Sequence, residues 1–329
     1  MARKPITHVV IMDGTLSDLG QKGVSNAGIT YKLLCEISSH TRLSLTYEEG
    51  IQWCTWRSVV DLAAGVGINS QICRAYGFLA SRYRPGDKIF FFGFSRGAYA
   101  VRSLAGVIDR IGLLRPEHAV ERNVTQVFRH YRKDPGAAAA RAIAKNKCWP
   151  KVPITMVGVW DTVKALGIQY PVLWRLAPSP TEFHSPSLGP STQNGFQALA
   201  MDETRVAYTP VMWKTDPSWT GRLEQMWFRG AHPDIGGQIG NFHAARPLSN
   251  IPLVWMLEHA ADLGLPLPDN WRARFKRDCD APAHGVNRGI ARFFLFRKKR
   301  VMLKDPSEHI FDNESLIKSA PELTPVKHR

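Results

Sequence analysis

The sequence has few cysteines and no long apolar run, and both absences limit what the protein is. Its five cysteines include no Cys-x-x-Cys pair, so we expect reduced, cytosolic thiols rather than a disulfide framework or a zinc site. No segment approaches the roughly 18 apolar residues that a membrane span needs. The first apolar run, 7–12, is too short for a secretory signal. We therefore expect a protein that is soluble and cytoplasmic when made, and any export must use a route without a cleaved signal.

Acidic residues are the minority among the charged ones. The 329 residues include 28 Asp and Glu against 43 Lys and Arg, which gives a net charge of +15 at pH 7. Such an excess favours an anionic partner, whether nucleic acid, a phospholipid surface or a phosphate-bearing substrate. The excess is concentrated in 272–304, where eleven basic residues meet only two acidic ones and 293–296 reads Phe-Phe-Leu-Phe. We expect this segment to contact an anionic membrane surface.

Segments typical of buried strands alternate with segments of helical periodicity. The 44% hydrophobic and 22% charged shares are those of a globular protein and exclude a disordered, collagen-like or coiled-coil chain. Four apolar runs predict strands: 7–12, 88–92, 154–160 and 223–228. Four stretches have apolar residues at helical spacing: 70–83, 98–111, 116–132 and 248–263. The alternation predicts an α/β fold, with a mostly parallel sheet covered by helices on both faces.

The change in composition near residue 269 divides the chain into two parts. Residues 1–268 hold all the predicted strands and are expected to form the main domain. Within it, 18–30 is predicted to be a surface loop, and 168–194, rich in Pro, Ser and Trp, an inserted loop or lid. Residues 269–329 are expected to be a basic extension that is packed on this domain or appended to it.

A serine lies between a predicted strand and a predicted helix, in the sequence Gly93-Phe94-Ser95-Arg96-Gly97. This G-x-S-x-G pattern in strand–turn–helix context is typical of a nucleophile elbow. The turn forces Ser95 into a strained conformation, and Gly93 and Gly97 let strand and helix approach each other. The hydroxyl then stands above the sheet edge, beside a helix N-terminus that stabilises negative charge. The alternative is a tight turn whose serine only caps the helix.

A nucleophilic serine needs a base and a group that orients the base. In enzymes with this elbow the order along the chain is Ser, then Asp or Glu, then His, each just past a strand. Asp161 ends the run 154–160 and His232 follows the run 223–228, so both fit this order. The alternatives are a turn or cap role for Asp161, a loop role for His232, and His309 as the catalytic base.

The negative oxygen of an acyl-transfer intermediate needs at least two fixed hydrogen-bond donors. The backbone N–H of Arg96 is one candidate, and the loop after the first strand, with Gly14 and Thr15, supplies others. Asp13 beside them is either a turn cap or, with Asp234 or Asp202, a metal ligand. Their spacing matches no defensible ligand pattern, so we expect neither a metal nor another cofactor.

Five sequence blocks together resemble a known family, the α/β-hydrolase catalytic domain of type VI lipase effectors. In chain order they are Met12-Asp13-Gly14-Thr15, the elbow 92–99, Gly158-Val159-Trp160-Asp161-Thr162-Val163, 198–205, and 227–237 with Arg229-Gly230-Ala231-His232-Pro233-Asp234. The resemblance implies an α/β-hydrolase fold and a Ser–Asp–His esterase that acts on phospholipid acyl esters. By motif, its triad falls on Ser95, Asp161 and His232.

The sequence departs from the family pattern at three places. Leu16 and Ser17 stand where members usually have Trp and Asn, 47–57 follows a Tyr-Asp-x-Gly-Val-Gly pattern only loosely, and Gln238 replaces a glycine. Effectors of this kind also look longer, with an added membrane-contacting module. In this sequence the basic segment 272–304 is the candidate for that role.

The leading hypothesis is a phospholipase that works through an acyl-enzyme, as a secreted antibacterial effector with secretion-system and immunity partners. The first alternative is a carboxylesterase on soluble or neutral lipid esters. The second is a basic nucleic-acid-binding protein on a hydrolase fold, which we expect less because no nucleic-acid motif accompanies the charge.

Overall fold

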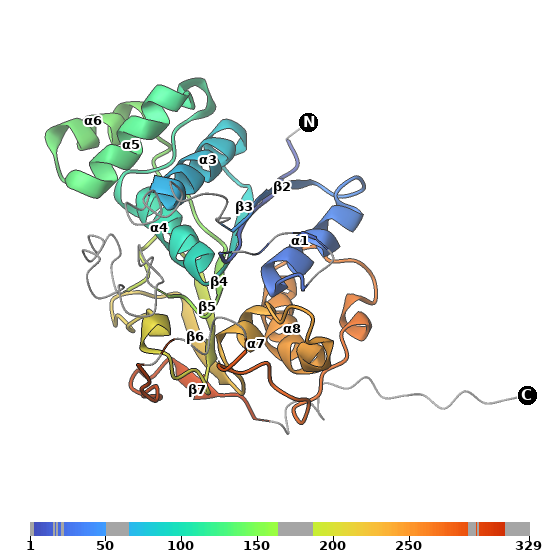
Figure 1. The fold of residues 1–329 in the computed structure, drawn as a ribbon. Helices are drawn as coiled ribbons and strands as arrows, with labels where there is room; N and C mark the ends of the chain where they lie inside the picture. The colour runs from blue at the N-terminus through green and yellow to red at the C-terminus, as the bar shows by residue number, and fades with distance from the viewer. Residues whose placement is uncertain are drawn as a thin grey trace, which may run out of the picture.

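The computed structural model describes residues 3–15, 17, 19–20, 23–50, 66–163, 187–288, 294 and 296–312. Its centre is a seven-stranded, all-parallel sheet with the order β2-β1-β3-β4-β5-β6-β7 (Figure 1). The strands are β1 (Thr7–Met12), β2 (Leu43–Glu48), β3 (Lys88–Phe94), β4 (Met156–Trp160), β5 (Asn194–Ala200), β6 (Arg222–Phe228) and β7 (Glu308–Ile310).

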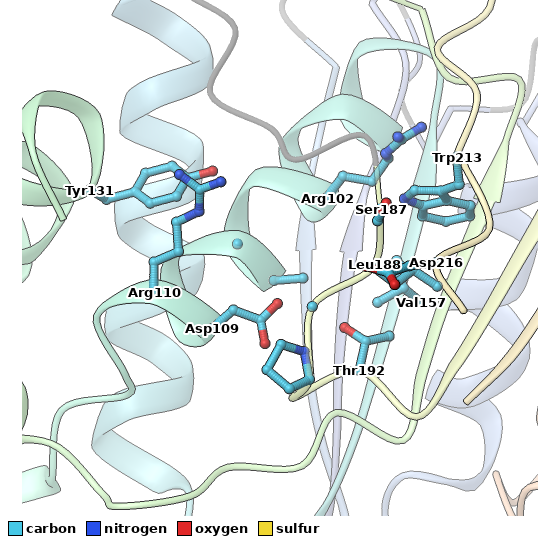
Figure 2. A pocket seen from close by; sticks show the side chains of 14 residues that line it. Arg102, Asp109, Arg110, Tyr131, Val157, Ser187, Leu188, Thr192, Trp213 and Asp216 are labelled. Atoms are coloured by element: carbon cyan, nitrogen blue, oxygen red, sulfur yellow. The ribbon is translucent and has the colours of Figure 1, made fainter. Parts of the chain in front are cut away.

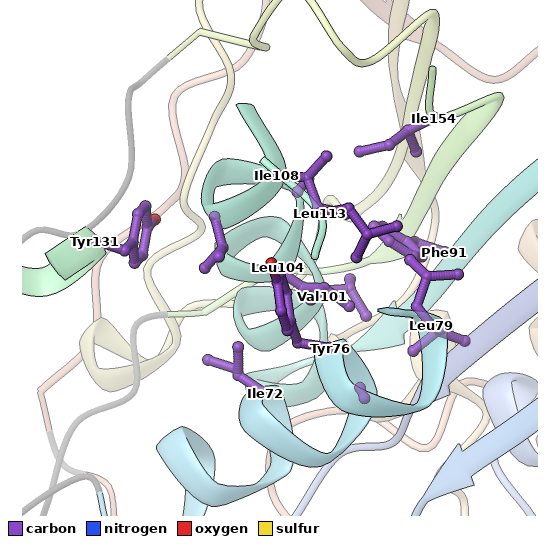
Figure 3. Packing of buried hydrophobic residues seen from close by; sticks show 14 of the residues in the cluster. Ile72, Tyr76, Leu79, Phe91, Val101, Leu104, Ile108, Leu113, Tyr131 and Ile154 are labelled. Carbon is purple, nitrogen blue, oxygen red and sulfur yellow. The ribbon is translucent and has the colours of Figure 1, made fainter. Parts of the chain in front are cut away.

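Successive residues of the central strands face opposite layers of helices. Val9 and Ile11 of β1 belong to one buried cluster, whereas Val10 and Met12 belong to the other. The first cluster is covered by α1 (Asn26–Ile37), α7 (His232–Gly236) and α8 (Arg246–Asp262). The second is covered by α3 (Val66–Arg82), α4 (Arg96–Arg110), α5 (Glu121–Lys133) and α6 (Ala138–Lys147). Figure 3 shows part of this cluster, in which Phe91 of β3 and residues of α3 and α4 such as Tyr76 and Leu104 are buried together. The predicted α/β fold with helices on both faces is confirmed.

The strand order reverses between β1 and β3, and this position fixes where the loops meet. From β1 the chain goes outward to β2 and returns to add β3 on the other side of β1. In open parallel sheets, the crevice at the carboxyl ends beside such a switch point is where ligands bind. The loop after β1 and the elbow after β3 therefore lie next to each other.

Several local predictions were wrong at their boundaries. The predicted surface loop 18–30 contains the start of α1, where the Ser25 hydroxyl accepts a hydrogen bond from the amide of Gly28 at 3.0 Å. The predicted helix 116–132 is a short 3-10 turn, Pro116–His118, followed by α5. Strand β2 was not predicted, because its residues are only half-buried and carry no continuous apolar run. Of the predicted lid 168–194, residues 168–186 lie outside the described residues, and Asn194 already begins β5.

The described part of the basic extension is packed against the rest of the chain. The Arg229 guanidinium donates to the carbonyls of Cys279 and Ala281, at 2.7 and 2.8 Å. Farther on, β7 pairs with β6 along the edge of the sheet. Within the described ranges, no helix combines the length and apolar character that crossing a bilayer requires.

Candidate active site

The elbow after β3 holds Ser95 in a conformation that few residues other than glycine adopt. Its φ of 57° and ψ of −118° lie outside the helical and strand regions. A Cβ on Gly93 would lie 2.6 Å from the Cα of Ala98, and one on Gly97 would lie 2.1 Å from the carbonyl oxygen of Met12. Both glycines are therefore needed for β1, β3 and α4 to approach one another. The Ser95 side chain makes no capping bond to α4, contrary to the alternative that it is only a helix cap.

Three side chains from three strand ends form a buried hydrogen-bonded relay. The Nε2 atom of His232 lies 2.9 Å from Ser95 Oγ, and its Nδ1 atom lies 2.6 Å from Asp161 Oδ2. The three residues are 6%, 4% and 0% exposed, in the order Ser95, His232, Asp161. The structure thus brings together the serine, acid and histidine that the sequence singled out.

The imidazole of His232 is fixed by packing as well as by the relay. Its ring packs against those of Phe94 and Tyr208, each with its centroid 4.8 Å away. Its backbone N–H donates to the Glu203 carboxylate at 3.2 Å. Burial lowers the pKa of His232, although Asp161 opposes this effect, and the shift favours the neutral ring, which is the form that can act as a base.

Asp161 has a cationic partner that the sequence analysis missed. The Arg300 guanidinium donates to both carboxylate oxygens, from Nη1 to Oδ1 at 2.6 Å and from Nη2 to Oδ2 at 2.9 Å. The amide of Ala200 also donates to Oδ1, at 3.1 Å. Burial alone would raise the pKa of Asp161, but the charge of Arg300 and the hydrogen bond from His232 outweigh it and hold the pKa well below its usual range. The carboxylate is therefore ionised.

A second buried ion pair borders the histidine. Arg205 Nη2 lies 2.6 Å from Glu203 Oε2, and the same guanidinium stacks on the Tyr208 ring at 3.9 Å from its centroid. Burial opposes ionisation of Glu203, yet the hydrogen bonds and charge of Arg205 lower its pKa. Both residues lie in the sequence block 198–205, but nothing in the sequence indicated that Glu203 contacts His232 or that Arg205 pairs with Glu203.

The loop after β1 lies against the nucleophile. A Cβ on Gly14 would be 3.3 Å from the Cβ of Ser95. The Gly14 amide donates to its neighbour Asp13 at 2.6 Å, whereas the Thr15 hydroxyl is buried and has no partner among the described residues. Gln238, one of the departures from the family pattern, donates to the Thr15 carbonyl at 2.8 Å and to the hydroxyl of Ser17, another departure, at 3.2 Å. Leu16 and 51–57 lie outside the described residues.

Asp13 organises this loop rather than grouping with other carboxylates. It accepts from the hydroxyls of Ser25 and Tyr47, at 2.5 and 2.6 Å. Burial raises its pKa, although these donors oppose the shift. Asp234 accepts from backbone amides at 231, 284 and 285, and Asp202 from the amide of Gly230. Among the described residues, no three His, Cys, Asp or Glu side chains are placed to hold a metal ion.

Arg96, the residue after the nucleophile, has a buried, positively charged side chain. The residue is 3% exposed, and none of its three guanidinium nitrogens has a hydrogen-bond acceptor in the described part of the chain. Burial lowers its pKa to about 10, an effect that the nearby Tyr208 partly opposes. Arg96 thus remains charged at neutral pH, close to the tyrosine that packs on His232.

The remaining candidate residues lie away from the relay. His309, the alternative base, is exposed in β7 opposite Met226. In the basic segment, Arg272, Arg274 and Arg277 pair with the carboxylates of Glu258, Glu36 and Glu258 at 3.0, 2.6 and 4.0 Å. Lys298, Lys299 and Lys304 are exposed, whereas Arg292, Phe293 and Leu295 lie outside the described residues.

A separate cavity of about 310 Å³ contains none of the relay residues. Figure 2 shows Asp109 and Arg110 of α4 and Tyr131 of α5 on one side of it, and Trp213 and Leu188 on the other. Asp109 accepts from the amide of Ser191 at 2.7 Å, and this contact closes one wall. The cavity is distinct from the site at Ser95.

The parallel sheet, the elbow and the relay at the strand ends define an α/β-hydrolase-like protein. More particularly, the sequence matches the type VI secretion phospholipase effector Tle1-like catalytic domain over residues 7–259, so the chain belongs to that family. The family resemblance stated from the sequence is confirmed.

Three individual proteins show weaker similarity. An uncharacterized protein of Saccharomyces cerevisiae, YEL023C, is 33% identical over 140 residues, which cover 38% of this chain and 20% of the yeast protein. An uncharacterized protein from Pseudomonas aeruginosa has a TM-score of 0.45 and 16% identity over 84% of this chain and 49% of its own. The Tle1 effector, solved bound to the VgrG spike of the type VI secretion system, has a TM-score of 0.37 and 20% identity over 71% of this chain and 51% of its own. The chain spans about half of each solved chain.

Proposed function

We propose that the protein is a serine esterase that hydrolyses acyl esters of phospholipids through an acyl-enzyme. The observation that carries the proposal is the buried relay, with 2.9 Å between Ser95 and His232 and 2.6 Å between His232 and Asp161. Membership of a phospholipase effector family supports the same chemistry. A Ser–His–Asp relay serves no purpose in nucleic-acid binding, so it favours the esterase over that alternative.

In the proposed first step, His232 Nε2 takes the Ser95 proton while Oγ attacks the ester carbonyl carbon. Asp161 accepts a hydrogen bond from Nδ1–H. This hydrogen bond keeps the proton on Nδ1 and leaves Nε2 unprotonated, as a base requires. The tetrahedral intermediate collapses when the carbon–oxygen bond to the alcohol breaks and His232 returns the proton to that oxygen. Water then attacks the acyl-enzyme by the same route, releases the fatty acid and restores Ser95.

The negative oxygen of the intermediate needs donors on the far side of Ser95 from the base. We assign the Arg96 backbone N–H, the first of helix α4, because the first amides of a helix lack acceptors within it. The Thr15 hydroxyl is a second candidate, since it has no partner within the described ranges. The Gly14 amide is engaged by Asp13, so we assign Gly14 the role of letting its loop approach Ser95.

The unpaired Arg96 guanidinium supports a phosphate-bearing substrate over a neutral ester. A buried cation without a counter-charge is costly, and an anionic group that binds beside Ser95 removes that cost. Ser95 and the next residue, Arg96, are both buried, so we expect an ester bound at the serine to lie near this cation. A phosphodiester is the anion that lies near the ester carbonyls of a phospholipid.

Labelling with a neutral fluorophosphonate tests the proposed function directly. We expect covalent modification of Ser95, located by peptide mass analysis, together with fatty-acid release from vesicles that contain anionic phospholipid. Prior labelling is expected to abolish that release. Labelling at a residue other than Ser95, or an unreactive protein that remains folded, would contradict the assignment.

Replacing Arg96 with glutamine tests the substrate class. The quantity to compare is kcat/KM for monomeric dihexanoylphosphatidylcholine divided by kcat/KM for dihexanoylglycerol. We expect this ratio to fall about 10- to 100-fold in the variant, because the loss of one charge-assisted hydrogen bond to the phosphate weakens binding by that factor. Arg110→Gln is the matched control, because it removes the same charge from the exposed end of the same helix. An equal loss on both substrates would favour the neutral-ester alternative.

The biological setting follows from the family. We propose that the protein is exported as an antibacterial effector through a type VI system and has secretion and immunity partners. We also propose membrane contact through the exposed part of 272–304, where Lys298, Lys299 and Lys304 supply the charge. Arg272, Arg274 and Arg277 are paired within the molecule, so they contribute less to this surface.

A further inference from the structure

The cation that holds the Asp161 carboxylate comes from outside the part of the chain that matches the family. That match ends at residue 259, whereas Arg300 lies in the basic segment 272–304. The Arg300 side chain is 5% exposed and the Asp161 side chain is fully buried. The contact is therefore inside the molecule and not part of a surface ion-pair network.

The Arg300 guanidinium is held in one orientation by four acceptors. Besides its two bonds to Asp161, Nη1 donates to the carbonyl of Ala200 at 3.0 Å and Nη2 to the carbonyl of Tyr208 at 2.6 Å. A planar guanidinium that binds both oxygens fixes the plane of a carboxylate as well as its position. Asp161 Oδ2 is thereby aimed at His232 Nδ1.

The segment that contains Arg300 is hydrogen-bonded to the rest of the domain at both of its ends. We call residues 296–310 the C-terminal strap. At its start, the Val206 amide donates to the Phe296 carbonyl at 3.0 Å and the Lys298 amide to the Thr204 carbonyl at 2.7 Å. At its end, β7 pairs with β6, and Trp227 Nε1 donates to Glu308 at 2.8 Å. The strap is therefore built into the fold beside the relay.

The charges around His232 give Arg300 a second effect. Asp161 at the end of β4 and the pair Glu203 and Arg205 in the loop after β5 carry the charges that act on the ring, and the Tyr208 ring lies against it. Arg300 on the strap pairs with Asp161, and Arg96 on α4 lies near Tyr208. Asp161 and Glu203 raise the pKa of His232 and Arg205 lowers it, whereas the positive charge of Arg300 lies directly on the Asp161 carboxylate. Without Arg300, the negative charge of Asp161 would act on His232 more strongly and favour the imidazolium form.

We propose that Arg300 is a positioning residue for the relay: it holds the Asp161 carboxylate in the plane that faces His232 and neutralises part of its charge. The active unit then comprises the family domain together with the C-terminal strap. This inference rests on the proposed function for its kinetic readout.

The test compares Arg300→Met and Arg300→Lys with the unaltered protein. For Arg300→Met we expect kcat/KM to fall about 10- to 100-fold, the loss typical when a partner that orients an active side chain is removed. We also expect the acidic limb of the pH profile to move up by about one unit, because the base gains protons more readily once the guanidinium is gone. Arg300→Lys keeps the positive charge but cannot bind both carboxylate oxygens as a guanidinium does. Its kcat/KM should therefore fall while the acidic limb of its pH profile stays in place.

A nuclear magnetic resonance titration of His232 separates this inference from the proposed function, because it needs no substrate. The His232 signal, assigned with His232→Gln, should titrate about one unit higher in Arg300→Met and unchanged in Lys299→Met. Lys299 is the matched control, since it is the exposed neighbour of Arg300 and carries the same charge. An unshifted His232 titration in folded Arg300→Met would overturn the inference, even if Ser95 proves to be the nucleophile. If Arg300→Met does not fold, a normal rate in Arg300→Lys would overturn it as well.

Discussion

Replacing Ser95 with alanine is expected to lower kcat for phospholipid hydrolysis by at least about 10⁴-fold, because the attacking atom is lost and the remaining groups catalyse only weakly. The fold should survive the change. The Ser95 hydroxyl contacts His232 and caps no helix, so its removal costs α4 nothing. Fatty-acid release from vesicles measures the activity, and thermal unfolding followed by circular dichroism measures the stability.

Ser103→Ala is the matched control for that experiment. It removes another buried hydroxyl, from helix α4 directly after the elbow, which donates to the Tyr99 carbonyl at 3.1 Å and takes no part in the relay. We expect it to retain most of the activity. If Ser95→Ala stays folded and keeps more than about one per cent of the rate, the serine is not the nucleophile.

Asp161→Asn is expected to lower kcat about 10⁴-fold, the loss found when a triad carboxylate becomes an amide. An amide has one oxygen, so it cannot accept both from His232 and from the two nitrogens of Arg300. If its NH₂ group faces His232, then Nδ1 must accept, and Nε2 carries the proton that it should take from Ser95. The change therefore removes the base as well as the orienting charge.

The same substitution should also destabilise the protein, because it leaves the buried Arg300 without a counter-charge. Breaking a buried ion pair from one side typically costs about 3–5 kcal/mol in the free energy of unfolding. Urea denaturation measures this loss, and the double variant Asp161→Asn with Arg300→Met should recover part of it without recovering activity. A stable, active Asp161→Asn protein would show that the Asp161–Arg300 contact is unimportant.

The sequence predicted the elements that carry the site better than their boundaries. Apolar runs before Ser95, Asp161 and His232 predicted β3, β4 and β6 because strands buried on both faces need continuous apolar residues. The half-buried β2, the three-residue β7 and β5, whose buried residues include Gly195 and Gln197, have no such run and were missed. The N-cap of α1 at Ser25 and the separate 3-10 turn at Pro116–His118 were also missed, since local spacing defines the ends of helices poorly.

What the sequence determined by itself is the order of the reacting side chains and their place at strand ends. Parallel strands bring their carboxyl ends to one edge, so residues 71 and 137 positions apart meet once the sheet forms. What only the tertiary structure decided is which charges enter the site. In the sequence, Arg300 is one of a run of basic residues and Arg96 is the variable residue of an elbow. Only the folded structure shows that both side chains are buried away from the water that would otherwise solvate their charges. Whether a charge is paired, exposed or buried alone depends on distant segments, and no local pattern records that.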